Sequence, residues 1–259
     1  MQMRREVQQA LEMAAAIDNA MARTLIRITG GVGVLDGEVP LVFDANHLRI
    51  DDVRGWDVRT LLQKGDQILG EAGIGYRELV LFDGSPEAES IAGELETYGW
   101  VVNRHLLMVL PERTELLGDR ELEVKEVEYR DIETVQAAAI REEAWADDRV
   151  TEQVVTRNRR VASVVDEQCY AVFEGVQPVS CCRLFVRDGV GQVENVATLG
   201  THRDRGLARA VVSRAVSTSR DRGATTVFLF ADADEWPRQM YGRWGFVEAA
   251  MTYHLHRWG

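Results

Sequence analysis

The chain has 259 residues, which is enough for one large domain or two domains of ordinary size. Hydrophobic residues make up 46% and charged residues 28%, a normal globular balance. The net charge of −12 argues against nucleic acid binding, because contacts with phosphates need a basic surface. The sequence has no apolar run long enough for a transmembrane helix, so we expect no contact with a membrane.

Apolar residues at helical spacing predict a helix over 3–21, rather than a signal peptide. A β-rich stretch follows at 24–44, with turns at Gly30-Gly31 and Asp36-Gly37. The next predicted elements form a β-α-β-α-β order: HLRID (47–51), a helix at 55–72, a strand at 78–83, a helix at 86–98 and strands within 100–110. A charge-rich linker is expected at 111–121.

The second half begins with a strand at 122–129 and helices at 131–145 and 151–165. Strands are then predicted at 169–175, 178–189 and 190–200, and a helix begins at Gly206. The chain closes with a buried strand at 224–232, a short helix at 236–245 and a last strand from Phe246.

The two halves share short motifs in the same order. RGW (54–56) corresponds to RGL (205–207), LF (81–82) to LF (229–230), and YGW (98–100) to WGF (244–246). Each pair occupies the same place in a β-α-β-α-β pattern. An internal repeat is therefore predicted, although short α/β units also resemble one another without being repeats.

Cysteine usage indicates a reducing compartment. Cys169, Cys181 and Cys182 are odd in number, and no C-x-x-C motif occurs. This pattern argues against a disulfide framework or a zinc site and favours a cytoplasmic location. We treat the cysteines as packing residues. His254 and His256 alternate on one face of a predicted strand, and we expect no metal there.

The segment THRDRGLARAVV (201–212) carries the clearest chemical motif. Arg203, Gly206 and Ala208 fit the pattern Q/R-x-x-G-x-G/A, placed after a strand and at the start of a helix. Small residues let backbone N–H groups approach a ligand, and a helix N-terminus adds unpaired donors and partial positive charge. The motif predicts an anion site that suits a pyrophosphate, while an ordinary capped helix with surface arginines is the alternative.

Two longer segments, VENVATLGTHRDRGLARAVV (193–212) and TTVFLFADADEWPRQMYGRWGF (225–246), resemble the GNAT superfamily of N-acetyltransferases. The resemblance covers residues 122–259 and implies that acetyl-CoA is the co-substrate. It implies that the pantetheine arm binds along a strand and the pyrophosphate in the loop that follows. The implied cofactor-binding residues are Val196, Ala197 and Thr198 on the strand and Arg203, Asp204, Arg205, Gly206, Leu207, Ala208 and Arg209 in the loop.

The resemblance also implies that Tyr241 protonates the leaving thiolate. The family often has asparagine seven residues earlier, where this chain has Asp234, so a cofactor contact there is in doubt. An attacking amine must lose a proton, and Glu194 is our candidate base because strand alternation would place it on one face with Val196 and Thr198. The alternatives are an exposed strand carboxylate for Glu194 and a core tyrosine for Tyr241.

We therefore expect an α+β (mixed α/β) chain with two domains. Residues 119–259 are expected to form a catalytic GNAT fold, a mixed and mostly antiparallel sheet flanked by helices. Residues 1–118 are expected to form a degenerate GNAT-like domain. Its loop DDVRGWDVRT has Asp52 and Asp57 where the second half has Arg203 and Ala208, and Leu95 and Glu96 lie where a tyrosine is expected.

The predicted activity is transfer of an acetyl group from acetyl-CoA to the primary amine of a small molecule, by direct attack in a ternary complex. A non-catalytic acyl-CoA-binding or regulatory protein is the alternative. The acceptor site is expected from 131–165 and 186–191. Within the first range, Trp145 is flanked by carboxylates, and this arrangement suits a cationic amine. The alternative is that the segment is an exposed helix end. Three roles of the first half remain open: covering the edge of the second domain's sheet, shaping the acceptor pocket, or forming a homodimer.

Overall fold

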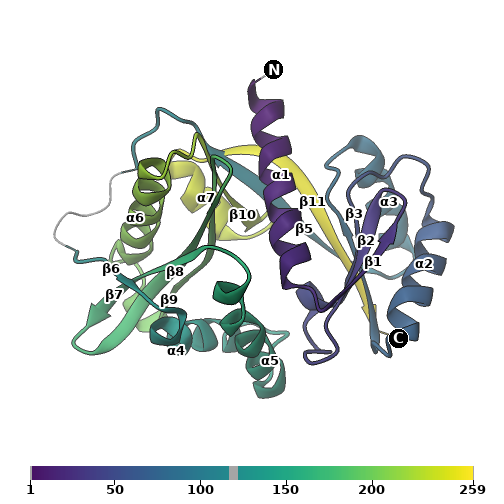
Figure 1. Ribbon diagram of the computed structural model, residues 1–259, viewed down its shortest axis with the longest axis horizontal. Coiled ribbons are helices and arrows are strands. Elements are labelled where there is room, and N and C mark those ends of the chain that lie inside the picture. The colour runs from purple at the N-terminus through teal and green to yellow at the C-terminus, as the bar shows by residue number, and fades with distance from the viewer. Residues whose placement is uncertain (1, 117–121, 259) are drawn as a thin grey trace. The chain divides into compact units, whose positions relative to one another are not determined.

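A computed structural model describes residues 2–116 and 122–258 and divides the chain into two compact units (Figure 1). The first-half unit consists of Ala15–Leu107, Phe230–Gln239 and Glu248–Gly259. The second-half unit consists of Met1–Ala14, Met108–Leu229 and Met240–Val247. The boundary that the sequence predicts between residues 118 and 119 lies outside the described residues, so the division into 1–118 and 119–259 stays a prediction.

The mixed α/β class is confirmed, and most helices and strands lie where the sequence patterns place them. The helices are α1 Gln2–Met21, α2 Val58–Glu71, α3 Pro86–Thr97, α4 Tyr129–Arg141, α5 Asp148–Arg159, α6 Leu207–Asp221 and α7 Trp236–Arg243. The strands are β1 Thr24–Ile28, β2 Gly31–Leu35, β3 His47–Ile50, β4 Tyr76–Leu81, β5 Val101–Leu110, β6 Lys125–Val127, β7 Glu167–Glu174, β8 Gln177–Arg187, β9 Val190–Thr198, β10 Thr226–Asp232 and β11 Val247–Trp258. None of the helices in the described residues is long and apolar enough to cross a membrane.

Three predicted helices have bounds that differ by three or more residues, among them α4, which is expected over 131–145 and observed at Tyr129–Arg141. The helix expected from residue 55 begins at Val58, because the Asp57 side chain accepts the Thr60 N–H and caps the helix there. The helix expected to run to 165 ends at Arg159, and a short 3₁₀ turn over Val161–Ser163 follows it.

The first-half sheet has the strand order β1-β2-β3-β4-β11-β5. Strands β3 and β4 are parallel, whereas β11, from the end of the chain, pairs antiparallel with β4 through Tyr253↔Leu81 to Trp258↔Tyr76. Tyr253 and Leu255 enter the hydrophobic core that the sheet shares with α2 and α3. The C-terminal strand is therefore an integral part of the first-half unit.

The second-half sheet has the strand order β10-β9-β8-β7-β6. Strands β9 and β10 are parallel, and the other neighbours are antiparallel. Cys181 packs in a core cluster with residues of α4, whereas the next residue, Cys182, contacts the Val211 carbonyl of α6. Because adjacent strand residues point to opposite faces, α4 and α6 cover opposite faces of this sheet, as can be followed in Figure 1.

The order β3-α2-β4-α3-β5 in the first half matches the order β9-α6-β10-α7-β11 in the second half. In each half the first two strands of this series are parallel. This correspondence of elements supports the predicted repeat.

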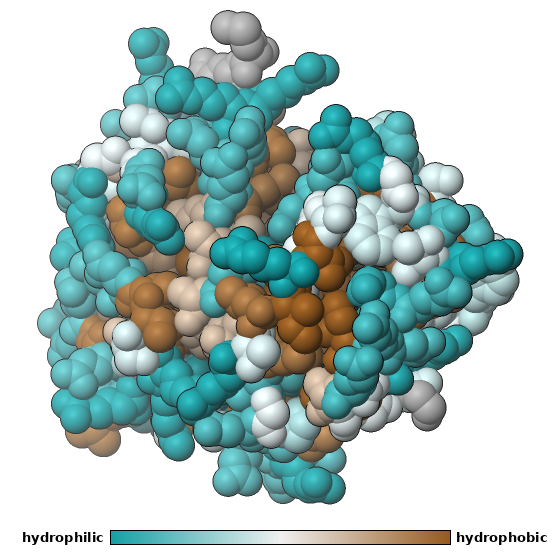
Figure 2. Space-filling model, turned by 45° about the vertical axis from the view of Figure 1, so that its right-hand side comes forward, coloured by the Kyte–Doolittle hydropathy of each residue, from teal (hydrophilic) through white to brown (hydrophobic). Residues whose placement is uncertain are grey.

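The surface view in Figure 2 shows mostly hydrophilic residues around the edge of one face, with hydrophobic residues gathered within it.

Four of the chain's five histidines lie in the first-half unit on the face of the sheet opposite the α2–α3 core: His47, His105, His254 and His256. The His105 and His254 rings stack with centroids 4.3 Å apart. His254 Nδ1 lies 3.7 Å from Glu78 Oε1, and Glu78 is only 2% exposed. No group of His, Cys, Asp or Glu within the described ranges has a geometry that could hold a metal ion.

Burial, reinforced by the neighbouring His105, His47 and His256, holds the pKa of His254 well below its ordinary value of 6.5. The folded protein therefore resists a proton that the unfolded chain accepts, so this histidine lowers stability as pH falls below about 6.5. We expect the free energy of unfolding of His254→Phe to fall less steeply than that of the parent as pH decreases, by up to about 1.4 kcal/mol per pH unit. Urea unfolding at pH 7.5, 6.5 and 5.5 measures the difference in slope between variant and parent.

A matched control is Glu78→Gln. Burial raises the pKa of Glu78 well above 4.5, so this carboxyl opposes the histidine by lowering stability as pH rises. Glu78→Gln should change the pH slope in the opposite direction to His254→Phe. Equal slopes in all three proteins would contradict the prediction.

Candidate active site

The loop between β9 and α6 exposes a helix N-terminus. A short 3₁₀ turn over Gly200–His202 leads to Asp204 and Gly206, whose φ values are +62° and +76°. Residues 203–206 are exposed, and a Cβ added at Gly206 would meet no atom of the described part of the chain within 4 Å. The glycine is therefore required by the backbone conformation, and the space in front of it is open.

Among the described residues, no side chain caps the N-terminus of α6, where Gly206 is the N-cap. The first intrahelical hydrogen bond runs from the Ala210 N–H to the Gly206 carbonyl at 3.0 Å, so the N–H groups of Leu207, Ala208 and Arg209 have no acceptor within the helix. By contrast, side chains of Asp57, Ser85 and Asp147 cap α2, α3 and α5. The donors at the start of α6 are thus available to an external anion.

The arginines of this loop are paired with carboxylates. Arg203 forms an ion pair with Glu142, the C-cap residue of α4. Both terminal nitrogens of Arg205 lie 3.3 Å from Glu174 Oε1, and His202 Nε2 lies 2.9 Å from Glu174 Oε2. The hydrogen bonds from His202 and then Arg205 lower the pKa of Glu174. A bound anion would therefore compete with Glu142 and Glu174 for these side chains.

Strand β9 has an open edge beside this loop. It pairs with β10 only through Val190, Gly191 and Gln192, although it continues to Thr198. The backbone of 193–198 therefore has no ladder partner in β10, and its outward N–H and C=O groups can bind an extended ligand. Val196, Ala197 and Thr198 lie on this segment.

A β-bulge divides β9 at Asn195. The register pairs Arg183 with Glu194 and Cys181 with Ala197, so Asn195 and Val196 together face the single residue Cys182. Asn195 adopts a left-handed φ of +49°. The bulge shows that the expected common face of Glu194 and Thr198 is wrong: Glu194 lies on the α4 face, and Thr198 lies opposite Ser180 on the other face.

Residues that the sequence did not single out hold the bulge. Gln136 of α4 donates from Nε2 to the Asn195 carbonyl at 2.7 Å, and Arg183 donates from Nη1 to Asn195 Oδ1 at 3.0 Å. Gln192 donates to Glu194 Oε1 at 2.6 Å. The signal for Arg183 was present, since a single charge inside the apolar run CCRLFV indicates a buried, paired side chain.

Tyr241 lies in α7 and is 7% exposed. Its ring makes edge-on contacts with Trp244 and Phe246, at centroid distances of 5.4 and 5.9 Å. Burial, with the nearby Cys182 and Glu194, raises the pKa of Tyr241 above its ordinary range. Burial thus keeps the Tyr241 hydroxyl protonated at neutral pH.

The corresponding loop of the first half is filled by its own carboxylates. Asp57 Oδ1 accepts the Thr60 N–H at 2.7 Å, and Asp83 Oδ2 accepts the Val53 N–H at 3.0 Å. Asp52 pairs with Arg54, whose hydrogen bonds lower the pKa of Asp52 to about 2. Protein carboxylates thus occupy the Val53 and Thr60 N–H groups of this loop and helix start, which supports the expected degeneracy of this copy.

The acidic segment around Trp145 shows the features of an exposed helix end. Trp145 is 63% exposed. Its neighbouring carboxylates already have partners: Glu142 binds Arg203, Asp147 caps α5, and Asp148 binds Arg141.

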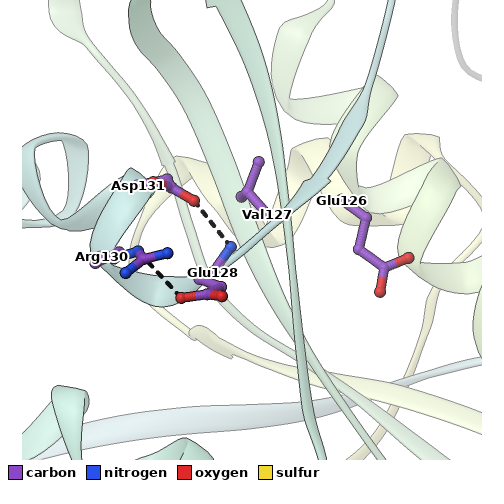
Figure 3. A pocket seen from close by; sticks show the side chains of 5 residues that line it. All are labelled: Glu126, Val127, Glu128, Arg130 and Asp131. Atoms are coloured by element: carbon purple, nitrogen blue, oxygen red, sulfur yellow. Dashed lines mark hydrogen bonds and ion pairs between the residues drawn. The ribbon is translucent and has the colours of Figure 1, made fainter.

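A shallow hollow at the start of α4 is also lined by groups that have partners (Figure 3). The Glu128 side chain pairs with Arg130, and the Glu128 backbone N–H donates to Asp131 Oδ2.

Residues 130–246 match the model of the family described as Acetyltransferase (GNAT) family. This range contains the open edge of β9, the start of α6 and Tyr241. Residues 130–246 belong to the GNAT acetyltransferase family. The second half of the chain thus carries a GNAT domain, while no curated protein matches the chain in sequence.

Solved structures show that the GNAT fold extends over nearly the whole chain. A GCN5-related N-acetyltransferase from Kribbella flavida is 20% identical, with a TM-score of 0.66 and 96% of each chain covered. A functionally unknown conserved protein from Staphylococcus epidermidis is 15% identical, with a TM-score of 0.72 over 92% of this chain and 94% of that one. A tandem GNAT protein from the clavulanic acid biosynthesis pathway is 11% identical, with a TM-score of 0.57 over 88% of this chain and 78% of that one.

Proposed function

We propose that the protein is an acetyl-CoA-dependent N-acetyltransferase that acts on the primary amine of a small molecule. The observation that carries this proposal is the uncapped N-terminus of α6 next to the open edge of β9. The first suits a pyrophosphate and the second an extended pantetheine arm, so the residues present fit acetyl-CoA. GNAT membership of residues 130–246 supports the same ligand.

Each proposed role follows from where a group lies. Val196, Ala197 and Thr198 offer backbone groups to the pantetheine arm, and the N–H groups of Leu207, Ala208 and Arg209 bind the pyrophosphate. Glu194 accepts the proton that the amine loses, directly or through water. The Val196 N–H donates to the oxyanion, and the Tyr241 hydroxyl donates its proton to the leaving sulfur. Because amine and thioester are held together, no covalent enzyme intermediate is required.

The decisive experiment combines acetyl-CoA binding with thiol release. Calorimetry without an acceptor measures acetyl-CoA affinity, and a thiol reagent then follows turnover over simple amines, amino acids, aminoglycosides and peptides. Binding and turnover with an amine support the proposal. Binding without turnover on any acceptor would favour a non-catalytic acyl-CoA-binding protein, and absence of binding would exclude both.

Glu194→Gln should lower kcat/KM about 100-fold, at the lower end of the range for loss of a general base. The reduction is limited because Glu194 is only half-buried, so water can replace part of its role. The amide still offers an acceptor to Gln192, so the local structure should survive. Steady-state kinetics with saturating acetyl-CoA measures the effect.

Glu126→Gln is the matched control, because Glu126 lies in strand β6 at the edge of the same sheet. This variant should keep the parent kcat/KM within about twofold. Full activity in Glu194→Gln would assign the base to another group.

A further inference from the structure

The bulge at Asn195 sets the positions of two groups in the proposed reaction. Glu194 precedes it and the Val196 N–H follows it. A change in the bulge would therefore move the proposed base and the proposed oxyanion donor together. The residues that hold Asn195 consequently bear on the rate of acetyl transfer.

Every nitrogen of the Arg183 guanidinium has a partner in the second-half unit. Nε binds Glu167 Oε1, Nη1 binds Asn195 Oδ1 at 3.0 Å, and Nη2 lies 3.4 Å from the Asn158 carbonyl. The side chains of Arg183 and Glu167 are 1% and 2% exposed. This buried pair therefore directs one guanidinium N–H at the side chain of the bulge.

Aromatic rings fix the orientation of the same guanidinium. Its central carbon lies 4.9 Å from the centroid of the Tyr129 ring and 5.4 Å from that of Phe185. Stacking and a fork of donors are properties of arginine that lysine does not share. On the α4 side, Gln136 binds the Asn195 carbonyl, so the bulge is held through both its side chain and its backbone.

We propose that Arg183, fixed by Glu167, is a positioning residue that sets the β9 bulge at Asn195 and through it the rate of acetyl transfer. This inference rests on the proposed function. It assigns a role to a buried ion pair that has no part in the proposed function as stated above.

The test uses the double variant Arg183→Met/Glu167→Met. Removing one partner alone would leave a buried charge and endanger folding, whereas replacing both with apolar side chains is often tolerated. We expect a folded protein whose kcat falls about 10-fold, while acetyl-CoA affinity falls by a smaller factor because the α6 N-terminus, which binds the pyrophosphate, is untouched. Amide hydrogen exchange should become faster in 193–198.

The exchange measurement separates this inference from the proposed function. If the parent protein transfers no acetyl group, the proposed function is wrong, whatever amide hydrogen exchange shows. An active parent whose folded double variant keeps full kcat and unchanged exchange in 193–198 overturns the positioning role. If the double variant does not fold, the Asn195→Ala variant is tested instead.

Asn195→Ala removes the acceptor of Arg183 and places alanine at a left-handed φ. Asp188→Ala is the matched control, because Asp188 has a φ of +51° and lies in the turn at the other end of β9. We expect kcat to fall about 10-fold in Asn195→Ala and less than about twofold in Asp188→Ala. Equal effects in both variants would indicate general backbone strain and overturn the proposal.

Discussion

Ala208→Glu should abolish acetyl-CoA binding at ordinary concentrations without destabilising the protein. The new carboxylate would lie in the first turn of α6, where it competes for the N–H groups proposed to bind the pyrophosphate. Two like charges about 4 Å apart near a surface repel by about 4 kcal/mol, equivalent to about a 1000-fold loss of affinity. Calorimetry with acetyl-CoA measures the loss.

The same substitution should leave the unliganded protein as stable as the parent or slightly more stable. A negative side chain at a helix N-terminus interacts favourably with the helix dipole, typically by about 0.3–1 kcal/mol. Arg59→Glu is the matched control, because Arg59 occupies the same second position of α2 in the first half. Loss of acetyl-CoA affinity in Arg59→Glu, with normal affinity in Ala208→Glu, would place the ligand in the first half.

Tyr241→Phe should lower kcat about 1000-fold, within the range for loss of a general acid. The effect is expected to exceed that of Glu194→Gln because Tyr241 is buried, so water cannot easily replace its hydroxyl. Phenylalanine keeps the ring contacts with Trp244 and Phe246, so the melting temperature should change little. Turnover at saturating substrates and a melting curve distinguish the two effects.

The pH dependence of the parent tests the same role. The raised pKa of Tyr241 keeps the hydroxyl protonated up to and beyond its ordinary value of 10.0. An acid that stays protonated causes no alkaline decline, so kcat should not fall between pH 8 and 10. A decline in this range that Tyr241→Phe abolishes would show a lower pKa and contradict the assigned environment.

Much of the fold could be predicted because most elements carry their own local signals. The turn at Gly30-Gly31, the helix after Ser85-Pro86 and the glycine before α6 each mark an element boundary by backbone chemistry. The start of α2 was placed at residue 55, whereas its N-cap is Asp57. A capping aspartate two residues after a glycine is a signal that motif matching alone overlooks.

The candidate site was predictable where it depends on sequence spacing and not where it depends on long-range pairing. Arg203, Gly206 and Ala208 lie within six residues, so their pattern is visible in the chain. The bulge at Asn195 arises from its register against β8 and from the side chains of Arg183 and Gln136, which are 12 and 59 residues away in sequence. Simple alternation therefore placed Glu194 and Thr198 on one face.

Strand β11 links the folding of the first-half unit to the order of synthesis. Its partner β4 leaves the ribosome long before residues 247–258 are made, so the edge of β4 that pairs with β11 lacks this strand during synthesis of the whole second half. Tyr253 and Leu255, which complete the core over α2 and α3, arrive equally late. Such distant pairing slows folding and leaves an exposed strand edge that invites incorrect pairing or chaperone binding on the nascent chain.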